Sequence, residues 1–353
     1  MNDLTPFIDA VQAAAASRTP LRLKGGGSKD FYGGMLVGEA LDVSGYRGIL
    51  DYQPAELCLT ARCGTPLAEV EALLAENGQM LPFEPPHFGA ATLGGMVAAG
   101  LSGPRRVQGW SLRDCLLGVR LIDGNGDLLR FGGPVVKNVA GYDVSRLLAG
   151  SLGTLGLIAE ATFKLLPRPV VEQSLAFEFD QAAAIVQLNR WAGQPWPISA
   201  SFWSDGVLVL RLSGAPTTVA AASQKLGGEP LAPAEAFWHN VREHRHAALA
   251  SGEVLWRLAL PSATPPLDLP GETVLEWNGG QRWLISDADV ASVRQAAAAA
   301  GGHATLFRAP ESLRCLEGAF APLSPALLAV QQRLKKAFDP HGIFNPGRLY
   351  AEI

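Results

Sequence analysis

The residues in this sequence best suited to bind a ligand are glycines rather than reactive side chains. Residues 24–30 read KGGGSKD, so three consecutive glycines precede a hydroxyl group and a positive charge. Glycine adopts positive φ angles without a steric penalty, and successive N–H groups can then line a concave nest that suits an anion. The pattern predicts that the backbone binds a phosphate group here, with a solvated turn as the alternative.

Two further stretches have the same character. Residues 85–106 read PPHFGAATLGGMVAAGLSGPRR, and residues 150–156 read GSLGTLG. Both place backbone donors beside hydroxyl side chains. Arg105 and Arg106 are candidates to neutralise phosphate charge, although arginine pairs on loops are more often merely solvated. Three such loops in one half of the chain predict a long ligand with a pyrophosphate group, whose charge is met by N–H dipoles.

The common nucleotide-binding motifs do not explain these glycines. The pattern GxxxxGK[ST] is absent, and so is the pattern GxGxxG with its following acidic residue. The four cysteines form no CxxC pair, which argues against an iron–sulfur cluster in this chain and favours reduced, mostly buried thiols. The three histidines within residues 239–246 would not share one face of a helix, so we predict no metal site.

Composition and charge narrow the function classes further. The chain has 353 residues, 48% of them hydrophobic, which predicts a globular protein of two domains. A formal net charge of -4 gives no basic field, so nucleic acid is not an expected partner. No signal-peptide pattern opens the sequence, and no uninterrupted apolar run of about eighteen residues occurs. We therefore expect a cytoplasmic protein.

Hydrophobic patterning predicts the elements that must position the glycine loops. In the first half, a helix is expected over 6–18 and a short strand that runs into the turn at 24–30. A strand followed by a helix is expected over 57–78. The turn DGNGD at 123–127 is a strong hairpin signal between two apolar runs.

After residue 168 the glycine density falls and strands alternate with helices. This alternation predicts an antiparallel sheet with helices on one face. The expected elements are strands within 170–180, 253–261, 273–286 and 303–309, a hairpin over 198–214, and helices over 181–193, 217–228, 287–302 and 324–338.

Four segments carry a resemblance to a known family: LKGGGSKDFYGG, TLGGMVAAGLSGPRRVQG, VKNVAGYD followed by GSLGTLG, and the tail FDPHGIFNPGR. They resemble the FAD-binding domain of the p-cresol methylhydroxylase (PCMH)/vanillyl-alcohol oxidase type, and more narrowly the FAD-binding subunits of bacterial glycolate oxidases. The resemblance extends over essentially the full chain. The combination of VKNVAGYD with GSLGTLG is specific, whereas the GGGS segment alone would be weak.

The resemblance implies an α+β fold in three parts. Residues 1–168 would form a PCMH-type FAD-binding domain made of two α+β subdomains. Residues 169–335 would form an antiparallel-sheet α+β cap domain that binds substrate or a partner. Residues 336–353 would form a C-terminal tail that returns to the flavin site.

The resemblance also implies that the ligand is FAD and that main-chain N–H groups hold its pyrophosphate. Many relatives attach the flavin covalently through a His or Cys in these loops. Here Lys29 and Asp30 follow the first loop, and His87 is not at a matching attachment position, so noncovalent FAD is expected. The implied contacts are Gly25, Gly26, Gly27, Ser28, Thr92, Gly94, Gly95, Gly141, Tyr142, Ser151, Gly153, Thr154 and Ile158.

The reaction that the resemblance implies is oxidation of a small 2-hydroxy acid, glycolate to glyoxylate, with FAD as hydride acceptor. Such a reaction needs a cation for the substrate carboxylate and a base for the hydroxyl proton. Arg308 and Arg348 are the candidate cations, because a guanidinium binds a carboxylate bidentately. His341 is the candidate base. Each has an ordinary alternative as a surface or turn residue.

Three interpretations stay open. In the first, the chain is the second flavoprotein subunit of a glycolate oxidase complex and relays electrons between a catalytic flavin subunit and an iron–sulfur subunit. Peripheral attachment to the inner membrane through those partners is left open. In the second it is a self-sufficient FAD-dependent 2-hydroxy-acid dehydrogenase, and in the third a structural flavoprotein scaffold. Related dehydrogenases carry a clustered His motif around GNxH, which is absent here, so we favour the first.

Overall fold

The structure, a computed structural model, describes residues 3–133 and 143–353, and the chain divides into two compact units. Unit 1 comprises Met1–Leu101, Ser111–Arg168 and Arg314–Ile353, and unit 2 comprises Ser102–Trp110 and Pro169–Leu313. The predicted boundary at 168 lies where the chain passes from unit 1 into unit 2. Residues 102–110, predicted in the first domain, lie in unit 2, and residues 314–335, predicted in the second, lie in unit 1.

Unit 1 is built around a five-stranded antiparallel sheet with strand order β3-β4-β8-β6-β7, beside a parallel pair β1-β2 and a short pair β5-β9. The strands β6 and β7 form the hairpin predicted around residues 123–127. The elements of unit 1 are α1 (Thr5–Ser17), β1 (Leu21–Lys24), β2 (Glu39–Asp42), β3 (Ile49–Gln53), η1 (Pro54–Glu56), β4 (Cys58–Arg62), α2 (Leu67–Glu76), β5 (Gln79–Met80), α3 (Leu93–Ala99), α4 (Leu112–Cys115), β6 (Leu116–Ile122), β7 (Leu128–Gly132), α5 (Ser145–Leu148), β8 (Leu157–Lys164), β9 (Leu166–Pro167) and α12 (Pro325–Phe338), with α11 (Glu311–Glu317) across the boundary of the two units.

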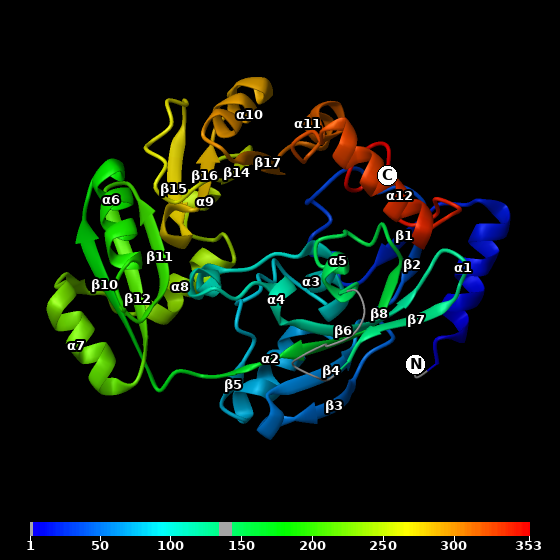
Figure 1. Cartoon of the computed structure of the whole chain (residues 1–353), viewed down its shortest axis with the longest axis horizontal. Coiled ribbons are helices and arrows are strands. Elements are labelled where there is room, and N and C mark those ends of the chain that lie inside the picture. Colours follow the sequence, from blue (N-terminus) through cyan, green and yellow to red (C-terminus); the bar gives the residue numbers. More distant parts are fainter. Residues whose placement is uncertain (1–2, 134–142) are drawn as a thin grey trace. The chain divides into compact units, whose positions relative to one another are not determined.

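The N-terminal helix and the C-terminal tail share one core in unit 1. Helix α1 buries Phe7, Val11 and Ala14, which the helical repeat places on one face. They pack in the same cluster as the tail residues Ile343 and Phe344. The tail is also hydrogen bonded to β1, since Leu21 N donates to Ile343 O over 2.7 Å. Figure 1 shows the red tail beside the blue β1. The last residues of the chain are therefore part of the structure that carries the first glycine loop.

Unit 2 is built around an eight-stranded antiparallel sheet with strand order β13-β10-β12-β11-β15-β16-β14-β17. Leu208, Leu210 and Leu212 alternate along β12 and face the helices, whereas Arg211 and Ser213 lie on the other face. The elements of unit 2 are η2 (Pro104–Gln108), β10 (Val171–Glu178), α6 (Gln181–Ala192), β11 (Ile198–Ser204), β12 (Val207–Gly214), α7 (Pro216–Leu226), β13 (Glu229–Pro230), α8 (Ala234–Arg242), α9 (Ala247–Ala250), β14 (Leu255–Ala259), β15 (Glu272–Glu276), η3 (Trp277–Gly279), β16 (Gln281–Ile285), α10 (Val290–Ala299) and β17 (His303–Arg308).

The three long helices α6, α7 and α10 all pack on the same face of this sheet. Helix α6 covers the leucines of β12, α7 covers Leu212 at its end, and α10 covers Trp256 and Leu258 of β14. Direct cross-strand pairing, for example Trp256 with Leu284, keeps all of these side chains on one side. The predicted α+β class with an antiparallel sheet is confirmed. The expectation that the helices lie on one face is corrected, because α8 packs on the opposite face, where Trp238 Nε1 donates to Ser174 Oγ over 2.8 Å.

The structure differs from the predicted elements at two places. The second glycine stretch contains helix α3, which begins after Thr92 even though Gly94 and Gly95 lie in its first turn. The histidine-rich segment is not one helix, because α8 ends at Arg242 and His244 has a φ of 52°. In both places local propensity is overridden by the packing around the segment.

Candidate functional site

A cleft in unit 1 brings together loops that lie far apart in the sequence. It holds about 110 Å³ of space and is open to solvent. Both the first and third glycine loops contribute to it, together with the start of α3. The predicted FAD contacts that line the cleft are Gly25, Gly26, Gly27, Ser28, Thr92, Gly94, Gly95, Gly153 and Ile158.

The other predicted FAD contacts do not line this cleft. Ser151 and Thr154 are buried behind it, where Ser151 Oγ accepts a hydrogen bond from Gly153 N and Thr154 Oγ1 donates to Ser151 O over 2.8 Å. They shape the third loop instead of facing the space. Gly141 and Tyr142 lie outside the described residues.

Two glycines of the first loop are required by close contact with the second stretch. A Cβ at Gly26 would lie 1.4 Å from the carbonyl oxygen of Ala90, and one at Gly25 would lie 2.3 Å from Thr92 Oγ1. Gly27 has a φ of 69°, which L-amino acids rarely adopt. The glycines therefore allow the two segments to meet.

The first loop also keeps its N–H groups available. Within the described residues, the backbone N–H groups of Gly26, Gly27 and Ser28 donate to no acceptor. These residues line the cleft, where Gly26 is exposed and Gly27 and Ser28 are half-buried, so their N–H groups are accessible to a ligand. An anionic ligand such as a pyrophosphate group would pair them, which fits the predicted cofactor.

The second stretch uses its backbone donors within the protein. Leu93 N donates to Thr65 O over 2.9 Å, Gly94 N to Cys63 O over 2.7 Å, and Gly95 N to Thr92 Oγ1 over 3.3 Å. The expectation that this stretch offers free N–H groups is corrected, because Thr92 caps α3 and Gly94 packs closely on Cys63, the residue after β4. Their contact with FAD through other atoms stays a prediction.

The third loop has a strained backbone. Gly150, Gly153 and Gly156 all have positive φ, and so does Leu152 at 51°. A bulky residue in the left-handed region costs about 1–3 kcal/mol, so the surroundings must hold it in place. Asn345 does so from the C-terminal tail: its Nδ2 donates to Leu152 O over 2.7 Å.

Asn345 and Lys335 together attach the C-terminal segment to the cleft. Asn345 Oδ1 accepts from Leu23 N over 2.8 Å, so one amide group joins β1 to the third loop. Lys335 is buried in α12, and its Nζ donates to Thr154 O over 2.7 Å and to Asp339 Oδ2 over 2.7 Å. Burial lowers the pKa of Lys335, and the Asp339 carboxylate opposes that shift. Sequence reasoning missed both residues as parts of the site.

Arg348 lines the cleft, but its donors are engaged by the backbone. Its Nη1 donates to Gly34 O, and its Nη2 donates to Tyr32 O over 2.5 Å and to the carbonyls of Lys29 and Asp30. Burial lowers the pKa of Arg348 to about 10, which leaves it charged at neutral pH. The structure thus gives this guanidinium a role in holding the end of the first loop, different from the predicted role as substrate ligand.

The other two predicted catalytic residues do not line the cleft. Arg308 lies in unit 2, where its Nη2 donates to Leu249 O over 2.7 Å and to Gly252 O over 3.1 Å. His341 is an exposed residue of the turn after α12. The structure therefore does not bring the predicted cation and base together in unit 1.

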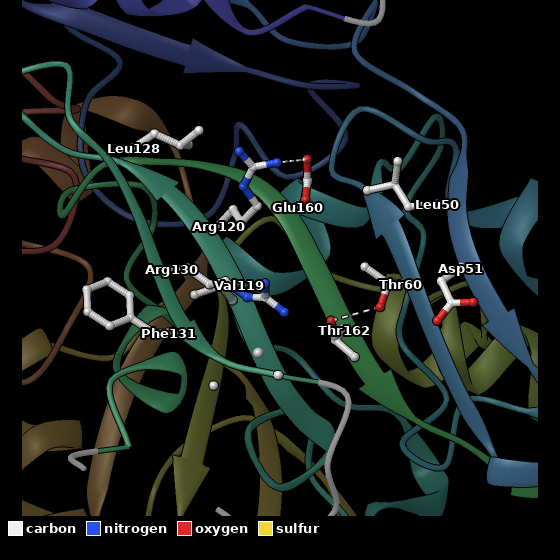
Figure 2. A pocket seen from close by; sticks show the side chains of 13 residues that line it. Leu50, Asp51, Thr60, Val119, Arg120, Leu128, Arg130, Phe131, Glu160 and Thr162 are labelled. Atoms are coloured by element: carbon white, nitrogen blue, oxygen red, sulfur yellow. Dashed lines mark hydrogen bonds and ion pairs between the residues drawn. The ribbon is translucent and has the colours of Figure 1, made fainter. Parts of the chain in front are cut away.

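A second cavity, of about 500 Å³, lies on the open face of the five-stranded sheet (Figure 2). Its charged side chains Arg120 and Glu160 point toward each other and form an ion pair of 2.8 Å. Thr60 and Thr162 are hydrogen bonded over 2.9 Å. None of the predicted site residues lines this cavity. The N–H groups of Gly26, Gly27 and Ser28 that donate to no acceptor among the described residues lie in the first cleft.

Residues 3–133 and 143–353 contain no group of three or more His, Cys, Asp or Glu side chains able to hold a metal ion. No helix in these ranges is both long enough and apolar enough to cross a membrane.

Family models match both ends of the chain. The model described as "FAD binding domain" matches residues 4–132, and the model described as "FAD linked oxidases, C-terminal domain" matches residues 321–349. The first match confirms the predicted FAD-binding domain, and the second falls on α12 and the tail that contact the cleft. The predicted cofactor, FAD, is thereby confirmed.

Comparison with known proteins gives full-length similarity. The glycolate oxidase subunit GlcE of Escherichia coli is 48% identical over 98% of this chain and 97% of that protein. The glycolate oxidase subunit GlcD of Bacillus subtilis is 32% identical over 39% of this chain and 30% of its own length. Among solved structures, an alkyldihydroxyacetonephosphate synthase matches with a TM-score of 0.66 at 17% identity, covering 98% of this chain and 75% of that one, which shows a shared fold.

Proposed function

Because the chain belongs to the family of the glycolate oxidase subunit GlcE, we propose that it is the FAD-binding subunit of a glycolate oxidase complex. In that complex it supports the oxidation of glycolate to glyoxylate and relays the electrons through its FAD. The observation that carries the proposal is the cleft of unit 1, in which the open N–H groups of Gly26, Gly27 and Ser28 meet two other glycine-containing segments.

The bound FAD supplies a two-electron acceptor, and the chain supplies its binding and orientation. The N–H groups of the first loop bind the pyrophosphate. Lys29 adds a positive charge beside them, and its Nζ is held by His87 O over 3.1 Å. Asn345 and Arg348 fix the two walls of the cleft by binding backbone carbonyls, which keeps those carbonyl oxygens away from a negatively charged ligand.

We propose that the FAD is bound noncovalently. His87 is hydrogen bonded to Glu71 over 2.9 Å. Cys63 lies beside Gly94, and burial raises the pKa of its thiol, so it is a poor nucleophile at neutral pH. Denaturation in trichloroacetic acid should release all the flavin into the supernatant, and flavin that stays with the precipitated protein would contradict this assignment.

We propose that its partners are a catalytic flavin subunit and an iron–sulfur subunit, and that any attachment to the inner membrane is peripheral and runs through them. The word subunit in the name of the E. coli relative supports a complex of several chains. Co-purification of the tagged chain with both partners checks this part of the proposal. Isolation of a monomer that oxidises glycolate without them would contradict it.

The decisive experiment is an anaerobic visible spectrum of the purified chain before and after addition of glycolate. Oxidised-flavin absorbance that is bleached only after the partner subunits are added supports the proposal. Bleaching of the isolated chain would make it a self-sufficient dehydrogenase. Failure to take up FAD at all would reject the proposal and favour a scaffold.

A further inference from the structure

The sheet of unit 2 has a second face, opposite α6, α7 and α10, on which polar side chains lie among aromatic ones. Arg257 of β14 lies on this face, since Trp256 and Leu258 on either side of it pack under α10. In the register of the sheet, Arg257 pairs with Trp283 of β16 and Thr305 of β17. Polar side chains on a sheet face that is partly buried need partners or a ligand.

Buried neighbours fix the orientation of Arg257. Its Nε donates to Gln281 Oε1 over 2.7 Å, and Gln281 Nε2 in turn donates to Glu276 Oε2 over 3.0 Å. Trp283 Nε1 donates to the same oxygen of Glu276 over 2.5 Å. Gln281 and Glu276 are each 3% exposed, so this chain of hydrogen bonds is held rigidly. Neither Nη group of Arg257 donates to an acceptor among the described residues.

Arg257 and a second arginine, Arg106, both lie against the indole ring of Trp277. The guanidinium of Arg257 is 5.4 Å from the ring centroid of Trp277, and that of Arg106 is 5.8 Å from it. The indole is itself anchored, because Trp277 Nε1 donates to Gly103 O over 3.1 Å. All of these residues belong to unit 2.

Neither Arg106 nor Arg257 forms an ion pair with a residue in 3–133 or 143–353. Arg105, the residue before Arg106, is by contrast buried and paired with Glu172 over 2.6 Å. The charge of Arg257 also acts on His303, whose pKa is lowered first by burial and then by this guanidinium. Two like charges around one ring repel each other, and a bound anion would relieve that repulsion.

We propose that Arg257 and Arg106, around Trp277, form a carboxylate-binding site of unit 2 that takes a small 2-hydroxy acid or its 2-oxo product. The outer Nη edge of a guanidinium matches the two oxygens of a carboxylate, and Arg257 already has that edge oriented. The indole gives an apolar wall for a short carbon chain. The identity of the acid rests on the proposed function, and the site itself rests on this geometry.

The test is isothermal titration of the FAD-loaded full-length chain with glycolate, glyoxylate and inorganic phosphate. We expect saturable binding of the two carboxylates and weaker binding of phosphate. Loss of a charge-assisted bond should weaken binding at least about tenfold in Arg257→Gln and in Arg106→Gln. Arg190→Gln is the matched control, since Arg190 is exposed on α6 and the substitution should leave binding unchanged.

The outcomes separate this site from the proposed function. Carboxylate binding that needs Arg257, without any bleaching of the flavin even with partners present, would support the site and reject the redox role. Glycolate-dependent bleaching that is unchanged in both arginine variants would agree with the proposed redox role and would overturn the proposed carboxylate-binding site. Tighter binding of phosphate than of glycolate would also overturn it. If Arg257→Gln does not fold, Arg106→Gln alone decides the test, and unchanged carboxylate binding in that variant would overturn the site.

Discussion

Asn345 and Leu152 are joined by a hydrogen bond of 2.7 Å although 193 positions separate them in the chain. The same side-chain amide accepts a hydrogen bond from Leu23 N, so it joins both walls of the FAD cleft. Leu152 has a left-handed backbone, and its carbonyl bond to Asn345 helps to hold that conformation. The width of the cleft thus depends on one residue near the C-terminus.

Replacing Asn345 by Asp should weaken FAD binding about tenfold, because the carboxylate cannot donate to Leu152 O and repels it. Fluorescence titration of the apoprotein with FAD measures the dissociation constant. Asn77→Asp is the control, since the Asn77 side chain is exposed and bonds only within its own helix, to Leu73 O. Equal dissociation constants for wild type and Asn345→Asp would show that the tail does not set the cleft.

Gly26→Val should abolish retention of FAD, because a side chain at Gly26 would overlap the carbonyl of Ala90. The first loop must then move away from α3, and its N–H groups lose their place in the cleft. The ratio of flavin to protein absorbance after gel filtration reports the loss. Gly45→Ala is the control, since a Cβ there meets nothing within 4 Å. If Gly26→Val keeps stoichiometric FAD, the first glycine loop does not bind the pyrophosphate as proposed.

Arg348→Met should lower FAD retention and the melting temperature together. It removes the guanidinium donors to the carbonyls of Lys29, Asp30, Tyr32 and Gly34, and the carbonyl of the buried Tyr32 then loses this hydrogen bond. Per bound flavin, the rate of glycolate-dependent reduction in the complex should be unchanged. Arg168→Met is the matched control at an exposed arginine of unit 1. A slower reduction of fully retained flavin would restore Arg348 as a substrate ligand.

The stability of unit 2 should fall as the pH drops below about 6.5, the ordinary pKa of histidine. Burial lowers the pKa of His244 to about 3, with further lowering by Arg308 and Arg257. Between these two values the unfolded chain binds a proton that the folded chain does not, so the free energy of unfolding decreases by at most about 1.4 kcal/mol per pH unit.

Chemical denaturation between pH 6.5 and 5 tests this prediction before most carboxylates titrate. His244→Asn should flatten the pH dependence, since asparagine tolerates the φ of 52° at this position. His341→Asn, at an exposed position, should keep the wild-type dependence. A slope that is the same in all three proteins would show that His244 does not contribute it.

Much of the fold and part of the site follow from local sequence. The hairpin at 123–127, the helices of unit 2 and the first glycine loop were predictable because turn residues and hydrophobic periodicity act over a few positions. Helix α3 was not, since two glycines disfavour a helix and only contacts with distant segments, such as Gly94 N with Cys63 O, outweigh that preference.

The roles of individual polar residues were the least predictable part. Lys335 lies in an amphipathic helix next to the exposed Lys336, and nothing in its position along the chain distinguishes it from a surface lysine. Arg348 was recognised as near the cofactor, but its actual acceptors are main-chain carbonyls that no sequence pattern reveals. Arg257 acquires its importance from residues on neighbouring strands that are 24 positions away, as with Gln281.

The position of unit 2 within the chain affects how the protein is made. Most of unit 2 is inserted between residue 168 and residue 314 of unit 1, and Asn345 comes after it. During synthesis the first glycine loop leaves the ribosome long before the residue that closes the cleft, and domains generally fold as they emerge. Cofactor capture should therefore wait until Asn345 has left the ribosome, and a ribosome stalled before Asn345 should display a folded unit 2 and a unit 1 that does not yet hold FAD.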